Sequence, residues 1–209
     1  MHTKTIVAFS ILAIAAAGIS IDASSSSKTS EIANSTSGDK MTLDQRAVKA
    51  YQYAKRHGMN TRYAFLVDYS IPSGTPRLFV WDYDKKKVVA RTYVMHGIGG
   101  GSTQDKPVFS NKPGSMCSSL GRFSVTKLHG SKLKRSFRLK GLDKSCSNAF
   151  RRGIMIHRSK WVDRWCNGEY IPLHKASCQG CITVSSKGMT YLEKLINSQS
   201  KPILLWSYV

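Results

Sequence analysis

Acidic residues are scarce in this sequence. Its 209 residues contain 12 Asp and Glu against 32 Lys and Arg, so the formal net charge at pH 7 is +20. A surface with such an excess of positive charge favours anionic partners, and nucleic acid and an anionic cell envelope are the two general candidates. Hydrophobic residues make up 41 % of the chain and charged residues 21 %. That composition predicts a packed core and argues against a largely disordered chain.

Signatures of several common protein classes are also missing. No internal repeat is visible in the sequence. The glycine run at 97–101 follows a predicted strand, but it has neither the Gly-Lys-Ser/Thr ending of a P-loop nor the G-x-G-x-x-G pattern of a dinucleotide site. We therefore expect a plain flexible loop beside the active site.

The first residues indicate export. Residues 1–4 form a short basic start with Lys4, and the run 5–19 is apolar. Ala23 is a candidate cleavage point and Ala17 a second one, which is the layout of a secretory signal peptide over 1–23. The apolar run is short for a membrane span, no basic cluster follows it, and no cysteine lies at the cleavage region for lipid attachment. We expect a protein of the periplasm or cell envelope, with no stable membrane span after cleavage. The positive charge then suits an anionic envelope polymer, and we expect no nucleic-acid partner.

The remainder of the chain has the pattern of a linker followed by one domain. Residues 24–40 are rich in Ser and Thr and predict a flexible linker, so the domain is expected over 41–209. Short runs rich in β-branched and aromatic residues predict strands. These runs are 63–70, 77–83, 88–96, 120–128, 136–142, 153–157, 180–184 and 203–208. We expect 153–157 and 180–184 to be the two central strands of a mainly β domain with a few helices.

Helices are predicted near both ends of this domain. The first covers 42–57, where Thr42 and Gln45 form a capping-box pattern. The second covers 185–198 and has an apolar face for the core. A short helix is also predicted over 147–152.

Two apolar runs end on side chains that suit thiol chemistry. Cys181 follows Gly180 at the start of one predicted strand, and His157 ends another. The thiolate is the reactive form of cysteine, and a histidine with a pKa near ~6.5 can take the thiol proton and later protonate a leaving amine. The backbone N–H groups of Gly180 and Cys181 are the expected donors to a developing oxyanion. This pattern predicts a secreted cysteine acyltransferase or hydrolase.

A catalytic histidine needs an acceptor that orients its second ring nitrogen. Neither Asp163 nor Glu169 has a position in the sequence that would direct it at His157, so the backbone carbonyl of Arg158 is the expected acceptor. An enzyme of this kind should also have one accessible thiol of low pKa.

The cysteines leave several alternatives open. Five occur in the chain, namely Cys117, Cys146, Cys166, Cys178 and Cys181. An odd number in an exported chain indicates one free thiol, and if this is Cys181, the sequence does not choose among the three pairings of the other four. The C-x-x-C pair of Cys178 and Cys181 lacks the βαβ surroundings of a thioredoxin-like dithiol. Two other hypotheses remain. One is a zinc site formed by Cys178, Cys181, Cys166 and either His157 or His174, and the other is a regulatory disulfide between Cys178 and Cys181.

Cations and aromatic residues near the predicted site suit an anionic substrate. Arg151 and Arg158 lie nearest in sequence, and Arg can hold a free carboxylate with two hydrogen bonds. Trp161 is a candidate for lining the cleft, although such residues more often pack in a core. The basic stretch 127–144 suits a polyanion, or it forms a solvated strand face.

Several stretches, in this order, resemble the L,D-transpeptidase (YkuD-like) catalytic domain in its divergent second subfamily. They begin at about Gly97 and comprise Phe109–Ser115, Ser118–Phe123, Leu139–Asp143, the strand ending at His157, and Ser177–Val184. The resemblance implies a β-rich, sandwich-like fold with Cys181 as the nucleophile, His157 as the general base and no cofactor.

The same resemblance implies a reaction on peptidoglycan. Cys181 would form a thioester with a stem tetrapeptide, release D-alanine and transfer the acyl group to an amine, which gives a 3→3 cross-link. Carbapenem-type inhibitors are expected to acylate the same cysteine. With water as acceptor the protein would be an L,D-carboxypeptidase or a cross-link hydrolase. A non-catalytic, basic envelope-binding protein is the alternative from another class.

The chain also departs from the family pattern. The usual Ser-His-Gly-Cys or Ser-Trp-Gly-Cys is here Cys178-Gln179-Gly180-Cys181. Gln179 can line the cleft and donate a hydrogen bond, but it cannot titrate. His174 is a second candidate for the base or for substrate binding, and it ranks below His157 because it lies in a polar loop.

Overall fold

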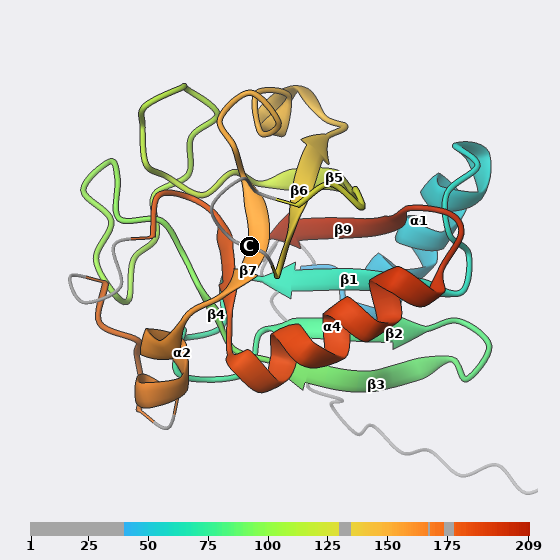
Figure 1. The fold of residues 1–209 in the computed structure, drawn as a ribbon, viewed down its shortest axis with the longest axis horizontal. Coiled ribbons are helices and arrows are strands. Elements are labelled where there is room, and N and C mark those ends of the chain that lie inside the picture. Colours follow the sequence, from blue (N-terminus) through green and yellow to red (C-terminus); the bar gives the residue numbers. More distant parts are fainter. Residues whose placement is uncertain (1–39, 130–134, 167, 174–177) are drawn as a thin grey trace, which may run out of the picture. The chain divides into compact units, whose positions relative to one another are not determined.

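The computed structural model describes residues 40–129, 135–166, 168–173 and 178–209 (Figure 1). The predicted signal peptide, the predicted linker up to residue 39 and His174 lie outside these ranges. Within them, no helix has the length and apolar character needed to cross a bilayer.

The described strands join in one nine-stranded sheet, accompanied by a few helices. In chain order the elements are α1 (Leu43–Arg56), β1 (Tyr63–Asp68), β2 (Leu78–Asp82), β3 (Lys87–Thr92), β4 (Val94–Met95), β5 (Gly121–Val125), β6 (Ser136–Gly141), the 3₁₀ helix η1 (Lys144–Cys146), β7 (Met155–Arg158), α2 (Lys160–Trp165), β8 (Ile182–Val184), α4 (Ser186–Ser198) and β9 (Ile203–Tyr208). The prediction of a mainly β fold with a few helices is confirmed.

The order of strands in the sheet differs from the predicted arrangement. It is β3-β2-β1-β9-β5-β6-β7-β8-β4, so β9 and β5 occupy the middle and β7 and β8 lie toward one end. The prediction that 153–157 and 180–184 are the central strands is therefore wrong. β7 and β8 are nevertheless direct neighbours and run parallel.

Two local predictions also fail. The helix predicted over 147–152 is absent. Residues 147–153 instead form turns that directly follow η1. The short helix α2 was not predicted, and Ser159 caps its start by accepting a hydrogen bond from the Trp161 backbone N–H.

α1 covers one face of the sheet. Its predicted capping box is present, since the Gln45 N–H donates to the Thr42 hydroxyl at 3.2 Å and the Thr42 N–H donates to the Gln45 side chain at 2.9 Å. The buried alanines of the helix pack on the residues of β1, β2 and β9 that point toward α1. Small side chains allow the helix to approach the sheet closely.

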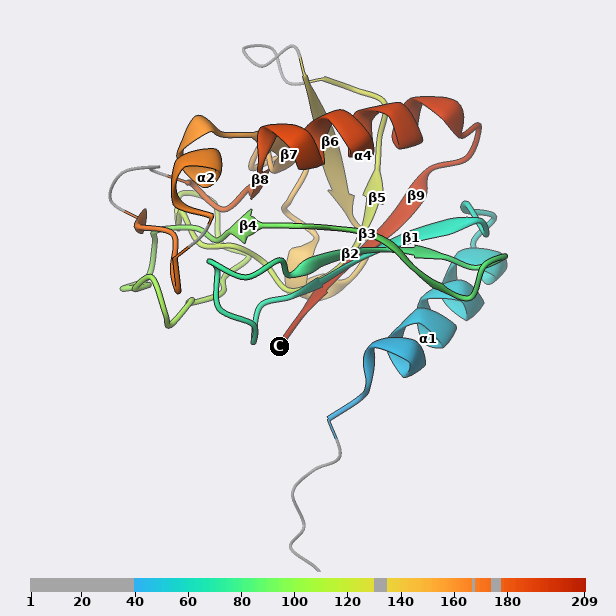
Figure 2. The ribbon, with the colours of Figure 1, turned by 90° about the horizontal axis from the view of Figure 1, so that it is seen from below.

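α4 covers the opposite face, so the sheet lies between the two helices (Figure 2). Along β1, Phe65 and Val67 belong to the core under α4, whereas Ala64 and Leu66 belong to the core under α1. This alternation follows from the two-residue period of a strand. As a result, the middle of the sheet is buried on both faces, and the two predicted site residues, His157 and Cys181, lie at the β7–β8 end.

Candidate active site

His157 and Cys181 come from two strands that pair directly. In the parallel register of β7 and β8, Ile156 lies opposite Ile182 and His157 lies opposite Thr183. Cys181 immediately precedes β8. Cys181 thus lies on the neighbouring strand, two residues before the residue opposite His157. At standard strand spacings this corresponds to about 8 Å between the Cα atoms of Cys181 and His157.

The pleat of the two strands places these side chains on one face. Ile156 and Ile182 are buried in the core under α4. Because side chains alternate along a strand, His157 and Thr183 point to the other face, and so does Cys181 if the alternation extends by one residue. Cys181 packs there against a smaller apolar cluster comprising Met95, Val162, Ile171, Leu173 and Cys178.

The imidazole of His157 is held at both nitrogens. Nδ1 lies 2.9 Å from the carbonyl oxygen of Arg158, the acceptor expected from the sequence. A carbonyl oxygen only accepts, so Nδ1 carries the proton and Nε2 has a free lone pair. Burial lowers the pKa of His157 below its ordinary value, and the bond to the Arg158 carbonyl opposes this in part. The ring is thus neutral at pH 7 and has the tautomer of a general base at Nε2.

The lone pair of Nε2 faces a hydroxyl. Thr183 Oγ1 lies 3.2 Å from His157 Nε2 and 3.3 Å from Cys178 Sγ. Cys178 is 4 % exposed, and its thiol also donates to the Cys181 carbonyl oxygen at 3.3 Å. Within the described residues, no hydrogen bond joins Cys181 Sγ to His157. His157 is therefore linked through Thr183 to Cys178, the other cysteine of the C-x-x-C pair.

The thiol of Cys181 is protonated in this resting arrangement. Burial, together with the nearby Cys178, raises its pKa to about 12, while a hydrogen bond from the Met155 backbone N–H and the charge of Arg152 act in the opposite direction. The expectation of a low-pKa thiol is therefore wrong for this state. A thiol of such high pKa reacts only if a base removes its proton as the bond forms.

Gly180 shapes the turn that presents Cys181. Its φ of +100° lies in a region that residues with a side chain rarely adopt. A Cβ at this position would also come within 2.3 Å of the Cys117 carbonyl oxygen. The turn therefore needs glycine for its backbone conformation and for its close approach to Cys117.

The glycine run at 97–101 has a packing role. A Cβ at Gly97 would lie 2.3 Å from the Met116 carbonyl oxygen, and one at Gly99 would lie 1.7 Å from the Ser115 carbonyl oxygen. The backbone N–H of Ile98 donates to the Cys178 carbonyl oxygen at 2.9 Å. This loop thus joins the segment around residue 116 to the C-x-x-C turn, a role that the sequence did not reveal.

A buried cationic network lies behind the apolar cluster. Arg77 is 1 % exposed and donates to the carbonyl oxygens of Val94 and Ile71 at 2.7 and 2.9 Å. Its Nη2 lies 3.0 Å from His96 Nδ1, so His96 accepts there and donates through Nε2 to the Thr103 carbonyl oxygen at 2.8 Å. Burial and the charge of Arg77 lower the pKa of His96 to about 4. These bonds fix β4, which pairs with β8.

The other predicted site residues are dispersed. Gln179 is exposed beside Gly180, and Arg158 and Arg151 are exposed. Trp161 is half-buried on α2. Asp163 accepts hydrogen bonds from the backbone N–H and hydroxyl of Ser186, so it caps α4 and is not the partner of His157.

Two residues at the site were missed from the sequence. Thr183 shares a face with Cys181, as its position two residues further along the chain indicates. Arg152, next to the predicted Arg151, turns toward the site and donates to the Cys117 carbonyl oxygen at 2.6 Å. No periodicity distinguishes the two arginines, because they lie in a turn rather than in a strand.

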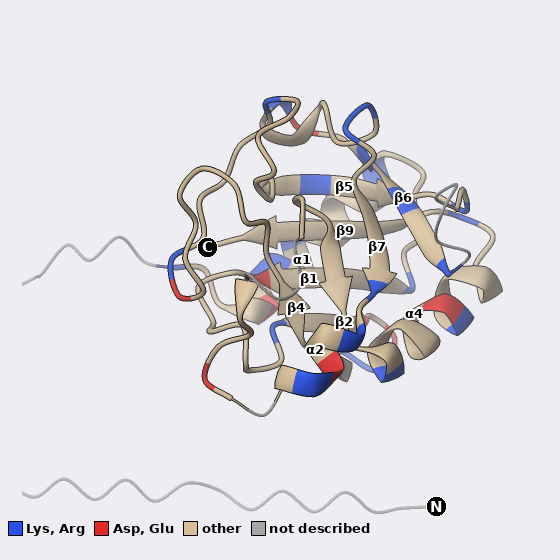
Figure 3. Ribbon diagram, turned by 60° about the vertical axis from the view of Figure 1, so that its left-hand side comes forward, with Lys and Arg blue, Asp and Glu red and all other residues tan. Residues whose placement is uncertain are grey.

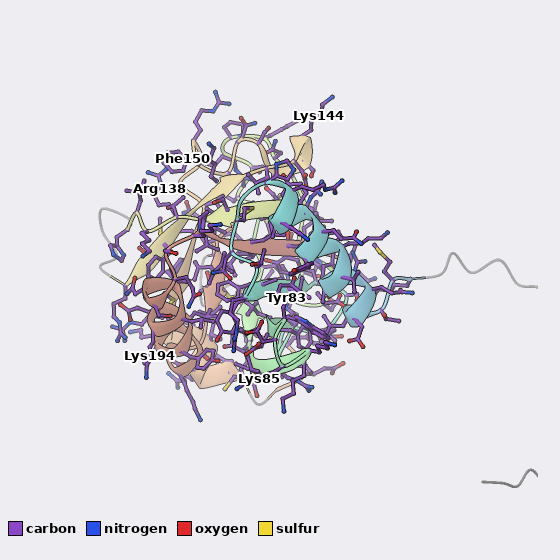
Figure 4. All side chains as sticks on the ribbon, turned by 90° about the vertical axis from the view of Figure 1, so that its right-hand side faces the viewer. Tyr83, Lys85, Arg138, Lys144, Phe150 and Lys194 are labelled. Atoms are coloured by element: carbon purple, nitrogen blue, oxygen red, sulfur yellow. The ribbon has the colours of Figure 1, made fainter. Side chains whose placement is uncertain are left out.

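Two cations of the basic stretch contact other residues of the chain. Figure 3 shows Lys and Arg on β6 and on the neighbouring β5. Arg138, on β6, lies 4.1 Å from the ring centroid of Phe150 (Figure 4). Arg135 pairs with Glu193. The remaining described lysines of the stretch, Lys127, Lys140 and Lys144, are exposed.

The alternatives based on cysteine receive no support from the described residues. Cys117, Cys146, Cys178 and Cys181 are free thiols. The described part of the chain holds no group of three or more His, Cys, Asp or Glu side chains that could bind a metal ion. His174, named for the zinc alternative, lies outside it.

The fold and the site together define a mainly β domain that presents a thiol and an imidazole on neighbouring parallel strands. The chain belongs to the L,D-transpeptidase catalytic domain family, whose profile matches residues 35–208. The match begins well before Gly97, so it includes α1 and the first strands as well.

Comparison with solved structures finds a distant likeness. The helical cell shape determining protein Pgp2 from Campylobacter jejuni, in a mutant form, is similar with a TM-score of 0.43 and 12 % sequence identity. The similarity covers 80 % of this chain and 56 % of that chain, so this chain spans little more than half the length of that protein. No curated protein matches the sequence.

Proposed function

We propose that the protein is an exported peptidoglycan L,D-transpeptidase in which Cys181 and His157 carry out acyl transfer. The observation that supports this most directly is the pairing of β7 with β8, which puts His157 opposite Thr183 and one diagonal step from Cys181. Family membership supplies the substrate class. Signal peptide, linker and domain are proposed at 1–23, 24–40 and 41–209.

In the proposed acylation, Cys181 attacks the carbonyl of the third, diamino-acid residue of a stem tetrapeptide. A sulfur–carbon bond forms as His157 Nε2 takes the thiol proton, and the same proton is then given to the amine of the terminal D-alanine as its carbon–nitrogen bond breaks. The donor remains as a thioester on Cys181. An acceptor amine then attacks the thioester carbonyl and releases the thiol, which regains a proton.

The charge that develops on the carbonyl oxygen is proposed to be stabilised by the N–H groups of Gly180 and Cys181. The positive φ of Gly180 turns the backbone sharply just before the nucleophile. Removal of one donor of this kind typically lowers the rate by roughly 10²–10³. Gln179, exposed beside the turn, is proposed to line the cleft, and Arg151 and Trp161 to contact the substrate further out.

The resting state requires one rearrangement before reaction. Nε2 of His157 faces Thr183, so the thiol of Cys181 must come within hydrogen-bond reach of Nε2 when substrate binds. A neutral thiol beside a neutral imidazole protects the nucleophile from adventitious reaction until then. The proposal therefore has proton transfer accompany attack rather than precede it.

The decisive experiment compares two alanine variants of the C-x-x-C pair. We expect Cys181→Ala to abolish D-alanine release from purified tetrapeptide muropeptides, and Cys178→Ala to retain most of it because Cys178 is buried. Intact-mass analysis should show one carbapenem adduct on the wild-type chain and none on Cys181→Ala. D-alanine release by Cys181→Ala at the wild-type rate would refute the assignment of the nucleophile.

The products separate the related activities. A 3→3 cross-linked dimer identifies a transpeptidase, a tripeptide product a carboxypeptidase, and cleavage of added dimers a hydrolase. If the folded wild-type chain released no D-alanine and took up no carbapenem, yet sedimented with isolated cell walls, the non-catalytic envelope-binding alternative would replace the proposal.

A further inference from the structure

Arg152 makes an unusual set of contacts beside the proposed site. It lies in the turn before β7 and is half-buried. Nη1 donates to the Ser110 carbonyl oxygen at 2.9 Å and to the Ser119 hydroxyl at 2.7 Å. Nη2 donates to the Cys117 carbonyl oxygen at 2.6 Å and to the Ser115 hydroxyl at 3.3 Å. Every partner belongs to the segment 110–119.

These partners are all neutral, so they satisfy the donors of the guanidinium without cancelling its charge. The ion pairs within the described residues involve Arg62, Arg122 and Arg135, and Arg152 belongs to none of them. A half-buried cation without a carboxylate partner retains a strong field in its surroundings.

The same guanidinium touches the turn that presents Cys181. A Cβ at Gly180 would lie 2.3 Å from the Cys117 carbonyl oxygen and 3.1 Å from Arg152 Nη2. The backbone of Gly180 thus rests on the carbonyl that Arg152 holds. A shift of Cys117 would therefore alter the direction of the backbone N–H groups of Gly180 and Cys181.

The segment 110–119 is held from two sides. Arg152 contacts both of its ends and the Cys117 carbonyl. Asn111 donates to the Lys144 carbonyl oxygen and the Ser147 hydroxyl, and accepts from the Asn148 N–H. A bridge between Phe109 and Ser118 closes the segment. Loss of Asn111 would loosen the contact with η1 and the turn that follows it, whereas loss of Arg152 also releases Cys117, which contacts Gly180.

We propose that Arg152 is a positioning residue of the acyl-transfer site, which holds the Cys117 carbonyl beneath Gly180 and places an unbalanced positive charge beside the turn that presents Cys181. This inference rests on the proposed function for its consequence in catalysis. Its geometric part, the link between Arg152 and the turn at Gly180, does not. The charge of Arg152 also lowers the pKa of the Cys181 thiol against the effect of burial.

The test uses two variants. Arg152→Gln loses the positive charge and the guanidinium hydrogen bonds, whereas Arg152→Lys keeps only the positive charge. Arg56→Gln, on the exposed end of α1, is the control for loss of one positive charge. Two quantities are measured on full-length, folded protein: kcat and KM for D-alanine release, and the rate of Cys181 alkylation by iodoacetamide between about pH 7 and 9, mapped by peptide mass.

We expect Arg152→Gln to lower kcat by roughly 10²–10³, the effect typical of a lost oxyanion donor, with KM nearly unchanged. Alkylation of Cys181 should be several-fold slower at each pH. Arg152→Lys should recover the alkylation rate but only part of kcat, and Arg56→Gln should match the wild type in both. If Arg152→Gln does not fold, Arg152→Lys alone decides: alkylation at the wild-type rate with reduced kcat supports the proposal.

Three results would overturn it. They are a wild-type kcat in folded Arg152→Gln, a change confined to KM, which would indicate substrate anchoring, and alkylation rates equal to the wild type in Arg152→Gln. Failure of the proposed function has another signature: the wild-type chain releases no D-alanine, yet Arg152→Gln still slows alkylation of Cys181, which supports the effect of the Arg152 charge on this thiol without any role in catalysis.

Discussion

The hydroxyl of Thr183 lies 3.2 Å from Nε2 of His157, on the ring nitrogen that must accept the thiol proton if Cys181 is the nucleophile. The other nitrogen is fixed by the carbonyl of Arg158. The ring is thus held on both sides in the absence of substrate. Thr183 also contacts Cys178, so one hydroxyl links the proposed base to the buried thiol.

Replacement of Thr183 by valine tests the importance of this contact. Valine keeps the shape of the side chain and removes a hydrogen bond that must break before Nε2 can accept the thiol proton, so we expect kcat for D-alanine release to rise, by up to roughly fivefold for about 1 kcal/mol from one hydrogen bond. Thr183→Ser keeps the hydroxyl and should stay near the wild type. A lower kcat in the valine protein would show that Thr183 orients the ring during the reaction as well.

The pH dependence of activity tests the protonation state of His157. Burial lowers the pKa of this residue, so the imidazole loses its proton at a lower pH than a free histidine does. A base must be neutral to accept a proton, and the acid limb of kcat/KM should therefore lie below about pH 6.5. The measurement is kcat/KM from about pH 4.5 to 8. An acid limb above about pH 6.5 would contradict the assignment of His157 as the neutral base.

The turn at Gly180 can be tested against a matched glycine. Gly58 also has a positive φ, of +62°, but no atom lies within 4 Å of a Cβ placed there. We expect Gly58→Ala to cost about 1 kcal/mol of unfolding free energy through backbone strain alone, with activity unchanged. Gly180→Ala adds a contact of 2.3 Å with the Cys117 carbonyl oxygen, so it should cost more and also abolish D-alanine release.

Urea unfolding together with the activity assay distinguishes the two glycine variants. Equal losses of stability in Gly58→Ala and Gly180→Ala would show that the close approach to Cys117 contributes nothing. Retained activity in a folded Gly180→Ala protein would argue against this turn as the source of oxyanion donors.

The stability of the domain at low pH should depend on His96. Its pKa is lowered from 6.5 to about 4, so below pH 6.5 the unfolded chain binds a proton that the folded chain does not. Stability should therefore fall as the pH drops from 6.5 toward 4, by up to about 3 kcal/mol from this residue. Urea unfolding between these pH values measures the loss.

His96→Gln is the control for this effect. Glutamine can accept from Arg77 but cannot titrate, so the variant should lose less stability on acidification than the wild type. Identical pH profiles for the two proteins would show that acid sensitivity arises elsewhere, for example at His157.

Elements with strong local signals could be predicted from the sequence. The capping box of Thr42 and Gln45 marks the start of α1, and Ser185 caps α4. Alternating β-branched and aromatic residues locate most strands to within a few residues. Sheet order could not be predicted, because β1 pairs in parallel with β9, an element separated from it by most of the domain.

The site could be predicted only in part, for a similar reason. His157 lies near the end of one strand and Cys181 at the start of another, which the sequence shows, and the family resemblance assigns both to one site. The contacts of Arg152 arise where a turn meets the distant segment 110–119, and no local pattern encodes such a meeting. The pKa of Cys181 depends on burial, which also becomes known only in the folded chain.

Gly97, Gly99 and Gly180 all bring backbone against backbone, with no side chain between the loops. Contacts of this kind leave no spacer that a substitution could shorten to make room elsewhere. The loop 97–101, the segment 110–119 and the turn 178–181 must consequently be exchanged as a block in any chimera or engineered transplant of this site. A library that varies a single loop would mostly yield misfolded proteins, whereas one that recombines all three from the same parent should preserve the framework.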